Sequence, residues 1–240
     1  MLLIGARLVG RSQVTRVHTV VTSRDGIEDA AIFEGLSPAD LKLAISGASV
    51  REAPEGTFLF NQGEPAGEVF LLECGRVRLN EITADGVELL IRFVRPGDVY
   101  GDRGAIAGAE YGASAVSETQ VRTYAWTTEV ITALLNEVPQ FARNLFAITA
   151  RYLQDSRERY RLLATASAEH RIRWALANLA RGIGSRKGNA TIITGRSVQR
   201  DIANLAGTTV YTVNRVLSGY ERRGLLTKER GRIVLFGEPK

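Results

Sequence analysis

The hydrophobic pattern of this chain changes period at Pro139, and this change limits the possible folds more than any other feature. Before Pro139, short apolar runs are broken by glycine turns, such as those at Gly63, Gly75 and Gly86. After it, no glycine occurs until Gly182, and apolar residues recur every three or four positions. The first pattern is typical of an antiparallel barrel or jelly roll, and the second predicts a long amphipathic helix. We therefore predict an α+β protein.

The first part of the chain, residues 26–137, is predicted to form the β-domain, after an N-terminal extension over residues 1–25. Apolar and charged residues alternate over residues 76–79, as in a half-buried strand. Residues 84–86 are a hairpin turn signal that leads to the next strand. A short helix precedes the strands, and we expect Ser37 to cap it ahead of Pro38 at its first position.

A long helix is predicted over residues 138–165, with one apolar stripe made by Phe141, Leu145, Ile148 and Tyr152. Such a stripe either packs on the chain's own barrel or pairs with the same helix of a second subunit, and the spacing favours neither. We assign these four residues to a dimer helix. A second helix is expected over residues 168–181, and residues 182–189 are interpreted as a flexible loop.

The C-terminal part, residues 166–240, contains a helix, a glycine turn and a second helix between residues 197 and 221. We expect Ser197 to cap the first helix and Thr209 the second, with Gly207 supplying the positive φ of the turn. Two short strands over residues 224–227 and 232–236 then predict a wing. Together these elements indicate a winged helix-turn-helix.

The second of these two helices is predicted to read DNA bases in the major groove. Its candidates for base contacts are Val210, Tyr211, Asn214 and Arg215, of which Arg215 matches the acceptor pair of guanine. Candidates for phosphate contacts are Gln199, Thr208, Thr209 and Thr212. The alternative is that each is an ordinary exposed polar residue. Charge favours DNA binding, because residues 1–140 carry a formal charge of −7 and residues 141–240 carry +12.

The few cysteines and histidines exclude several classes of site. Cys74 is the only cysteine, so a cluster held by cysteines alone is excluded. The two histidines, His18 and His170, lie outside the predicted barrel, which disfavours a metal enzyme of the jelly-roll type. No apolar run is long enough to span a membrane. We therefore predict no enzyme activity and a cytoplasmic location.

Several motifs in order resemble the cyclic-AMP receptor/fumarate-nitrate regulator family. Residues 60–64 and 75–77 look like the turns of its β-roll, and residues 95–102 look like the entry to its ligand-binding cassette. Residues 201–215 look like its helix-turn-helix. The resemblance implies a cyclic-nucleotide-binding-like β-roll, a dimerisation helix and a winged helix-turn-helix. It also implies a bacterial transcription regulator that acts as a homodimer on palindromic double-stranded DNA. The resemblance also makes RNA polymerase a candidate partner.

The sequence departs from the family where its members bind a cyclic nucleotide. The usual Gly-Glu pair is Gly101-Asp102 here, and the Arg-Ser or Arg-Thr pair that holds the phosphate falls on Gly112-Ala113. On the long helix, the hydroxyl pair that contacts adenine falls on Ser156-Arg157. The effector pocket that the resemblance implies therefore consists of Gly101, Asp102, Arg103, Gly112, Ala113, Ser156 and Arg157, and its composition disfavours cyclic AMP.

The nature of the signal stays open at this point. An Fe–S cluster is excluded by the single cysteine, while haem, another small molecule or a redox signal remains possible. The strand around Cys74 is apolar, so we expect a packed and inert thiol there. The alternatives are a regulator that binds DNA constitutively without an effector, and a jelly-roll enzyme.

Overall fold

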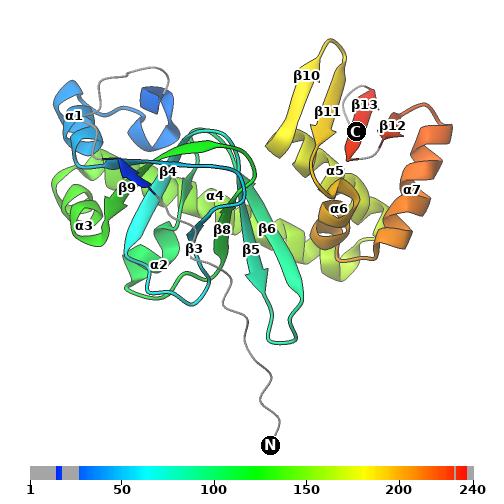
Figure 1. Cartoon of the computed structure of the whole chain (residues 1–240), viewed down its shortest axis with the longest axis horizontal. Helices are drawn as coiled ribbons and strands as arrows, with labels where there is room; N and C mark the ends of the chain where they lie inside the picture. Colours follow the sequence, from blue (N-terminus) through cyan, green and yellow to red (C-terminus); the bar gives the residue numbers. More distant parts are fainter. Residues whose placement is uncertain (1–14, 18–26, 230, 237–240) are drawn as a thin grey trace, which may run out of the picture.

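The computed structural model describes residues 15–17, 27–229 and 231–236, which form two lobes joined by a long helix (Figure 1). Of the predicted extension, Thr15–Val17 form strand β1, which pairs with the edge of the N-terminal sheet. These three residues are therefore a strand and not part of an unstructured extension. The remaining residues of the extension, including His18, lie outside the described residues.

The N-terminal lobe is a β-roll made of two antiparallel sheets. One sheet has the order β1-β2-β9-β4-β7, and the other has the order β3-β8-β5-β6. Its strands after β1 are β2 Ser49–Ala53, β3 Phe58–Phe60, β4 Glu68–Cys74, β5 Val77–Ile82, β6 Glu88–Val94, β7 Val99–Tyr100, β8 Ser114–Ser117 and β9 Val121–Thr127. The predicted hairpin at residues 84–86 is confirmed, because β5 pairs with β6 across it.

Short helices close this lobe around an aromatic core. They are the 3-10 helices η1 Ile27–Asp29 and η2 Ala31–Phe33 and the α-helices α1 Pro38–Ser46, α2 Asp102–Ala107 and α3 Thr128–Glu137. Ser37 caps α1 as predicted, since its hydroxyl accepts a hydrogen bond from the backbone N–H of Asp40. The indole of Trp126 meets the ring of Phe33 edge-on in the buried core.

Helix α4, Pro139–Thr165, runs from the β-roll to the C-terminal lobe. Phe141, Leu145 and Ile148 are buried in the core of the β-roll, and Tyr152 packs against the same core. The assignment of this stripe to a dimer contact is therefore wrong, because the chain's own barrel covers it. The opposite side of α4 exposes a different set of large apolar side chains.

The C-terminal lobe contains three helices and a small antiparallel sheet of order β10-β11-β13-β12. Its elements are α5 Ala168–Ile183, β10 Gly184–Lys187, β11 Ala190–Thr194, α6 Val198–Ala206, α7 Val210–Arg222, β12 Leu226–Glu229 and β13 Arg232–Phe236. The loop predicted at residues 182–189 is instead largely strand, because β10 pairs in register with β11. The predicted wing is confirmed as β12 and β13.

Cys74 is the last residue of β4, and its side chain is exposed. The expectation of a packed thiol is therefore wrong, because the buried apolar part of β4 ends at Leu72. No helix among the described residues is long and apolar enough to cross a membrane.

Candidate DNA-binding and effector sites

The helix-turn-helix consists of α6 and α7, and its turn has the backbone geometry that the sequence predicts. Gly207 has a φ of +56°, in the left-handed region that favours glycine. A Cβ added there would lie 2.5 Å from Cδ2 of Leu163 on α4, so the turn rests directly on the long helix. The hydroxyl of Thr209 accepts a hydrogen bond from the N–H of Thr212 and caps α7, as predicted. Ser197 precedes α6 but makes no such bond.

The two sides of α7 differ sharply in exposure. Val213 and Leu217 are completely buried against the rest of the lobe. The four candidates for base contacts lie on the other side, where Val210, Asn214 and Arg215 are exposed and the side chain of Tyr211 is 77% exposed. This side of α7 is therefore free to enter the major groove of DNA, as the sequence predicts.

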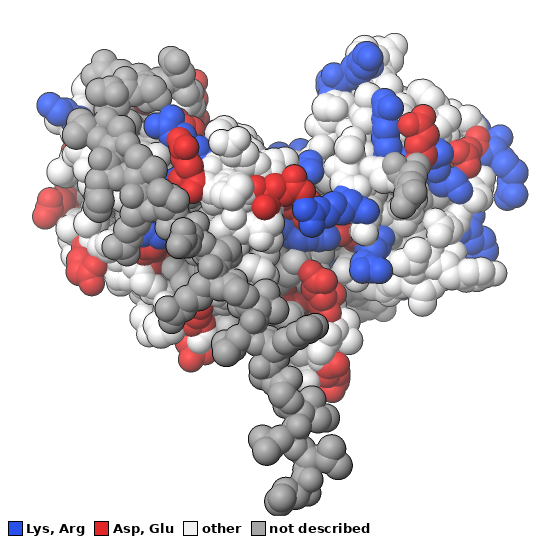
Figure 2. All heavy atoms as spheres, in the orientation of Figure 1, with Lys and Arg blue, Asp and Glu red and all other residues white. Residues whose placement is uncertain are grey.

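The candidates for phosphate contacts lie at the N-terminal ends of α6 and α7. Thr209 is exposed, and Gln199, Thr208 and Thr212 are half-buried. Thr209 and Thr212 also hydrogen-bond one another through their hydroxyls. Figure 2 shows lysine and arginine side chains spread over the C-terminal lobe, the lobe that the sequence predicts to bind a polyanion.

Two arginines that the sequence analysis did not single out hold the helix-turn-helix in place. Arg171 on α5 donates to the carbonyls of Ala206 at 2.8 Å and Ala166 at 3.0 Å, which joins the turn to the end of α4. Arg159 on α4 donates to the carbonyl of Asn204 on α6 at 3.0 Å. Both arginines satisfy carbonyls at helix ends, so α6 is fixed to the neighbouring helices. Each arginine donates to a carbonyl of α6, which is distant in the sequence, so no local sequence pattern predicts these roles.

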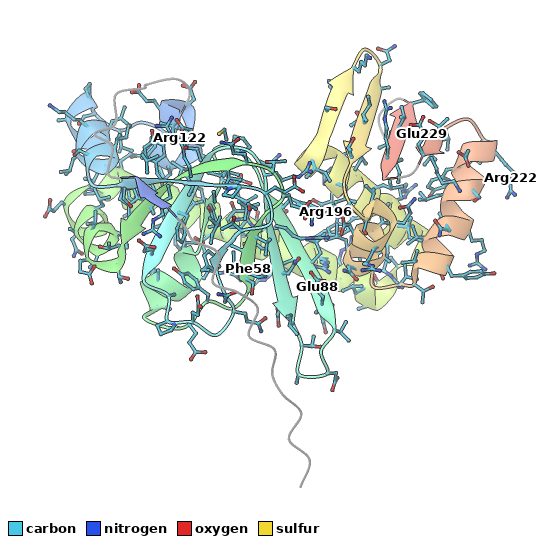
Figure 3. The ribbon with its side chains drawn as sticks, in the orientation of Figure 1. Phe58, Glu88, Arg122, Arg196, Arg222 and Glu229 are labelled. Atoms are coloured by element: carbon cyan, nitrogen blue, oxygen red, sulfur yellow. The ribbon has the colours of Figure 1, made fainter. Side chains whose placement is uncertain are left out.

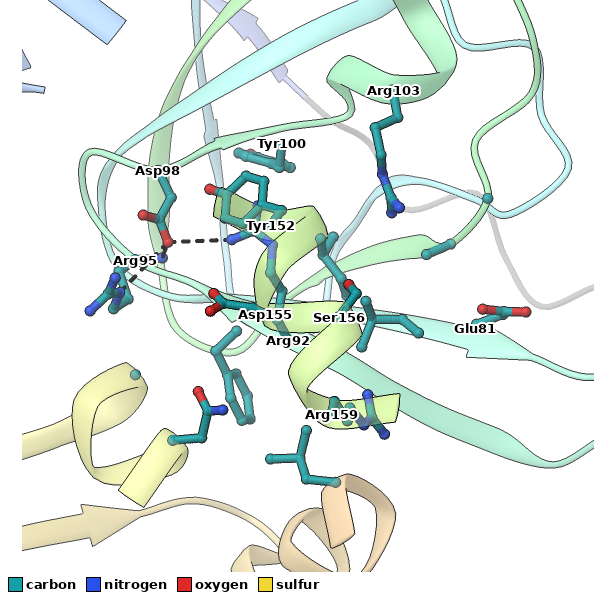
Figure 4. Close-up of a pocket in the computed structure, with 18 of the residues that line it drawn as sticks. Glu81, Arg92, Arg95, Asp98, Tyr100, Arg103, Tyr152, Asp155, Ser156 and Arg159 are labelled. Carbon is teal, nitrogen blue, oxygen red and sulfur yellow. Dashed lines mark hydrogen bonds and ion pairs between the residues drawn. The ribbon is translucent and has the colours of Figure 1, made fainter. Parts of the chain in front are cut away.

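A cavity of about 580 Å³ lies between the β-roll, α4 and the C-terminal lobe (Figure 4). Six of the seven predicted pocket residues line it, namely Gly101, Asp102, Arg103, Gly112, Ala113 and Ser156. Arg157 does not line the cavity. The sequence did not identify the C-terminal contribution, which comes from Trp174, Asn178 and Arg181. A molecule in this cavity would contact both lobes.

Part of the wall of this cavity is fixed by its own polar contacts. The guanidinium of Arg92 lies 4.1 Å from the ring centroid of Tyr152, donates to the carbonyl of Val99 at 2.8 Å and pairs with Asp98 at 3.3 Å. Burial raises the pKa of the Tyr152 phenol to about 12. Tyr152 is therefore a neutral ring at physiological pH, and it joins α4 to the β-roll.

The possible axial ligands for haem are separated in the structure. His170 is exposed near the start of α5, and Cys74 is exposed at the end of β4. Neither residue lines the cavity. No described residue that lines the cavity is a histidine or a cysteine, so neither of these two haem ligands is present there.

Two family descriptions match separate parts of the chain. The cyclic nucleotide-binding domain profile matches residues 50–138, and the Crp-like helix-turn-helix domain profile matches residues 170–237. The cyclic AMP receptor protein of Thermus thermophilus is 30% identical over 83% of this chain and 89% of its own length. This chain belongs to the cyclic-AMP receptor/fumarate-nitrate regulator family.

Other members of the family match across the same length. A CRP-like cAMP-activated global transcriptional regulator of Mycobacterium tuberculosis is 26% identical over 87% of this chain and 93% of its own length. The c-di-GMP responsive regulator CLP of Xanthomonas campestris has a TM-score of 0.69 over 84% of this chain and 100% of its own, and at 23% identity it shows the fold alone. The protein is a DNA-binding transcriptional regulator of this family, and these relatives are regulators rather than enzymes.

The cavity lining has Gly112 and Ala113 at the positions where the resemblance implies an arginine and a hydroxyl for a cyclic phosphate. Gly112 and Ala113 present no cation and no hydroxyl there, and Tyr111 beside them stacks on Phe60 with ring centroids 3.9 Å apart. The phenol of Tyr111 donates to the carbonyl of Glu68 at 2.9 Å, which holds the ring in the barrel. A phosphate bound against Gly112 and Ala113 would receive no charge or hydroxyl from these two residues, and a buried phosphate without a counter-ion is costly.

Asp102, the one carboxylate among the predicted pocket residues, already has a hydrogen-bond partner. Asp102 is buried, and the hydroxyl of Thr149 on α4 donates to it at 3.3 Å. Arg103 extends from α2 toward the cavity in Figure 4 and is exposed. Its guanidinium is the cation best placed to meet an anionic group of another ligand.

Proposed function

We propose that this regulator works as a homodimer formed by the exposed side of α4. Phe146, Leu153 and Tyr160 follow one another at intervals of seven residues, and the side chains of Phe146 and Tyr160 are 77% and 75% exposed. Large apolar side chains at a seven-residue period are typical of paired helices. Leu163 continues the exposed set toward the C-terminal lobe. The second copy would cover this side of α4, while the barrel covers the other side.

We propose that each subunit reads one half of a palindrome with α7. The observation that carries this proposal is the open side of α7, with Arg215 exposed opposite the buried Val213 and Leu217. Arg215 would bind guanine through its forked guanidinium, and Tyr211 and Val210 would make apolar contacts, for instance to a thymine methyl. Asn214 is the remaining base contact, and Gln199, Thr208, Thr209 and Thr212 would position the helix on phosphates.

We further propose that a small molecule other than cyclic AMP controls this DNA binding from the cavity. Because the cavity is lined by the β-roll, α4 and α5, an occupant changes the contacts among all three. Arg103 favours a ligand with an anionic group, and Tyr152, Phe93 and Trp174 favour one with an aromatic or apolar body. The second candidate, a regulator that needs no effector, is supported by the side chains of Tyr111 and Phe60, which stack inside the barrel.

The test is a selection of random duplexes by the purified protein without added ligand. An enriched palindrome supports a dimer that is active without an effector and defines the operator. A protein that selects no sequence until a cell extract of small molecules is added supports the effector. Enrichment of a site without two-fold symmetry contradicts the proposed dimer.

The dimer surface is tested separately by Phe146→Asp together with Leu153→Asp. A charge at both positions would be buried in the helix pair without a partner, so we expect a monomer in analytical ultracentrifugation. Gln154→Asp is the matched control, because residue 154 is exposed on the same helix but is not part of the apolar series. A dimer that survives the double substitution would show that another surface forms it.

A further inference from the structure

The β-roll and the DNA-binding domain of one subunit share a packed junction along α6. Leu90 and Phe93 on β6 are buried in the apolar cluster formed by the C-terminal lobe, together with Ile202 and Leu205 of α6. Arg159 donates to the carbonyl of Leu90 at 3.3 Å as well as to α6, so α4 is part of the same junction. The two domains are therefore docked on one another and not only linked through the chain.

A buried ion pair crosses this junction. Arg78 on β5 donates to Asp201 on α6 through both terminal nitrogens, with Nη1 at 2.8 Å from Oδ1. Asp201 is only 2% exposed. Nε of Arg78 lies 3.2 Å from Glu118, and its guanidinium lies 5.2 Å from the ring centroid of Phe93. A carboxylate buried this deeply depends on its counter-ion, because removing the partner leaves a charge without water.

Acidic groups of the β-roll surround the N-terminal half of α6. Glu55 pairs with Arg196 just before the helix, and Glu118 shares the guanidinium of Arg78. Glu88 on β6 accepts a hydrogen bond from Asn80 on β5 at 2.6 Å, in the same hairpin that carries Arg78. Figure 3 labels Arg196 and Glu88 near the boundary between the two lobes. These carboxylates belong to the lobe that does not bind DNA.

Their position conflicts with the way a helix-turn-helix meets DNA. When the second helix enters the major groove, the first helix crosses the phosphate backbone. Arg78 is the single cation paired with both Asp201 and Glu118, so this group keeps an excess negative charge, which would repel phosphates that approach the N-terminal half of α6 in the docked state. The base-reading side of α7 is open at the same time. Docking therefore obstructs the backbone contact while leaving the base contacts exposed.

We propose that Arg78 and Asp201 form a self-inhibitory latch, which holds α6 against the β-roll and must open before the domain engages DNA. This proposal rests on DNA binding by the helix-turn-helix, and it does not require a palindrome, a dimer or an effector. It also gives the proposed effector a physical target, because Leu205, Arg159 and Phe93 line the cavity and belong to the junction.

Arg78→Ala is the variant that should open the latch. It leaves the carboxylate of Asp201 without its counter-ion in the docked state, so the docked state becomes unfavourable at neutral pH. Adding Asp201→Asn to Arg78→Ala removes that uncompensated charge and should restore docking. This rescue separates the latch from general damage to the fold, since a misfolded protein is not repaired by a second substitution.

The docked state can be measured through the native cysteine. Cys74 lies on the β-roll and is exposed, and Asn189→Cys adds a second label at the exposed turn between β10 and β11. Double electron–electron resonance on this pair, with labelled subunits diluted by unlabelled protein, reports the distance between the two domains. DNA binding is measured by fluorescence anisotropy with a mixed-sequence duplex at one fixed salt concentration.

We expect Arg78→Ala to broaden the distance distribution and to tighten duplex binding about tenfold, because a larger share of the protein is competent to bind. The double variant should return both readings toward wild type. Arg143→Ala is the control, since it removes the same charge from an exposed side chain that bonds only Gln140 among the contacts described for it. Loss of a positive charge weakens non-specific binding by itself, so tightening cannot come from charge alone. Unchanged or weaker binding by Arg78→Ala, or a double variant that stays undocked, would overturn the latch.

Discussion

The two helices of the helix-turn-helix have opposite surroundings. Helix α7 exposes Tyr211, Asn214 and Arg215, and its capping threonine is bonded at its first turn. Helix α6 is enclosed on nearly all sides, and its one acidic residue, Asp201, faces the β-roll. The difference indicates separate roles for the two helices. Helix α7 is arranged to meet a partner outside the chain, and α6 is arranged to receive contacts from inside it.

The largest expected effect comes from removing a side chain that lies on the buried side of α7. Leu217→Ala removes a completely buried side chain of α7 and should lower the free energy of unfolding by about 2–5 kcal/mol, as measured by urea denaturation. Tyr211→Ala on the exposed side of the same helix is the control and should change it by about 0.5 kcal/mol or less. Equal losses for the two variants would mean that α7 does not have one buried and one open side.

The open side of α7 is tested by Arg215→Ala. Losing a bidentate contact to guanine should cost about 1–3 kcal/mol of discrimination between the selected site and mixed-sequence DNA. Binding to mixed-sequence DNA should remain and should stay sensitive to salt. A variant that retains its sequence preference in a competition assay would remove Arg215 from the base-reading residues.

The helix caps give a smaller and more direct comparison of α6 with α7. Thr209→Ala removes the bonded cap of α7 and should cost about 1 kcal/mol of unfolding free energy. Ser197→Ala removes a side chain that makes no capping bond at α6, so it should cost about 0.5 kcal/mol or less. Thermal unfolding of the two variants side by side measures the difference. A larger loss for Ser197→Ala would reverse this comparison.

The weakest expected effect is that of pH on docking. Burial raises the pKa of Asp201 from 3.8 to about 6, and this exceeds the opposite influence of Arg78. Proton uptake by Asp201 therefore adds to the stability of the docked state, fully below the ordinary carboxyl range, and this addition is lost as the pH rises through about 6. Above that pH, the ion pair with Arg78 is what offsets the burial of the carboxylate. The charged groups that face Asp201 are Arg78, Arg76, Glu118 and Glu88.

The distance between the labelled domains measures this pH effect. For the wild-type side chain at position 201, the docked share should increase when the pH is lowered from neutral to below the pKa of Asp201. Asp201→Asn cannot titrate and should show a flatter response. A wild-type protein that undocks as the pH falls would mean that the attraction of Arg78 for the carboxylate outweighs the effect of burial on the pKa of Asp201.

The sequence predicted the elements whose signals are local. Gly207 and Thr209 define the turn and the second cap within a few residues, and alternation identified β5 and its hairpin. The partner of α4 could not be predicted this way, because both sides of the helix carry apolar series and only tertiary packing selects one. The pairing of Arg78 with Asp201 spans 123 positions and has no local pattern.

The sequence predicted only part of the effector cavity, because part of its lining depends on tertiary packing. Matching the family motifs found the residues of the β-roll and α4, since those motifs lie within continuous segments. Trp174, Asn178 and Arg181 enter the cavity only because the C-terminal lobe docks beside it. The strand β10 was missed because its glycine and charged residues match a loop, while pairing with β11 outweighs that local preference.

The contact between Leu163 and the turn at Gly207 has a consequence for how this protein can evolve. The last turns of α4 contribute to the exposed apolar side, and the same turns support the glycine that sets the angle between α6 and α7. A substitution in these turns that changes the exposed apolar side of α4 therefore also changes the support for the angle between α6 and α7. Position 207 leaves no room for a side chain, so lineages that vary at position 163 must compensate elsewhere along α4. Changes in the exposed apolar side of α4 and changes in the angle between α6 and α7 are then expected to arise together.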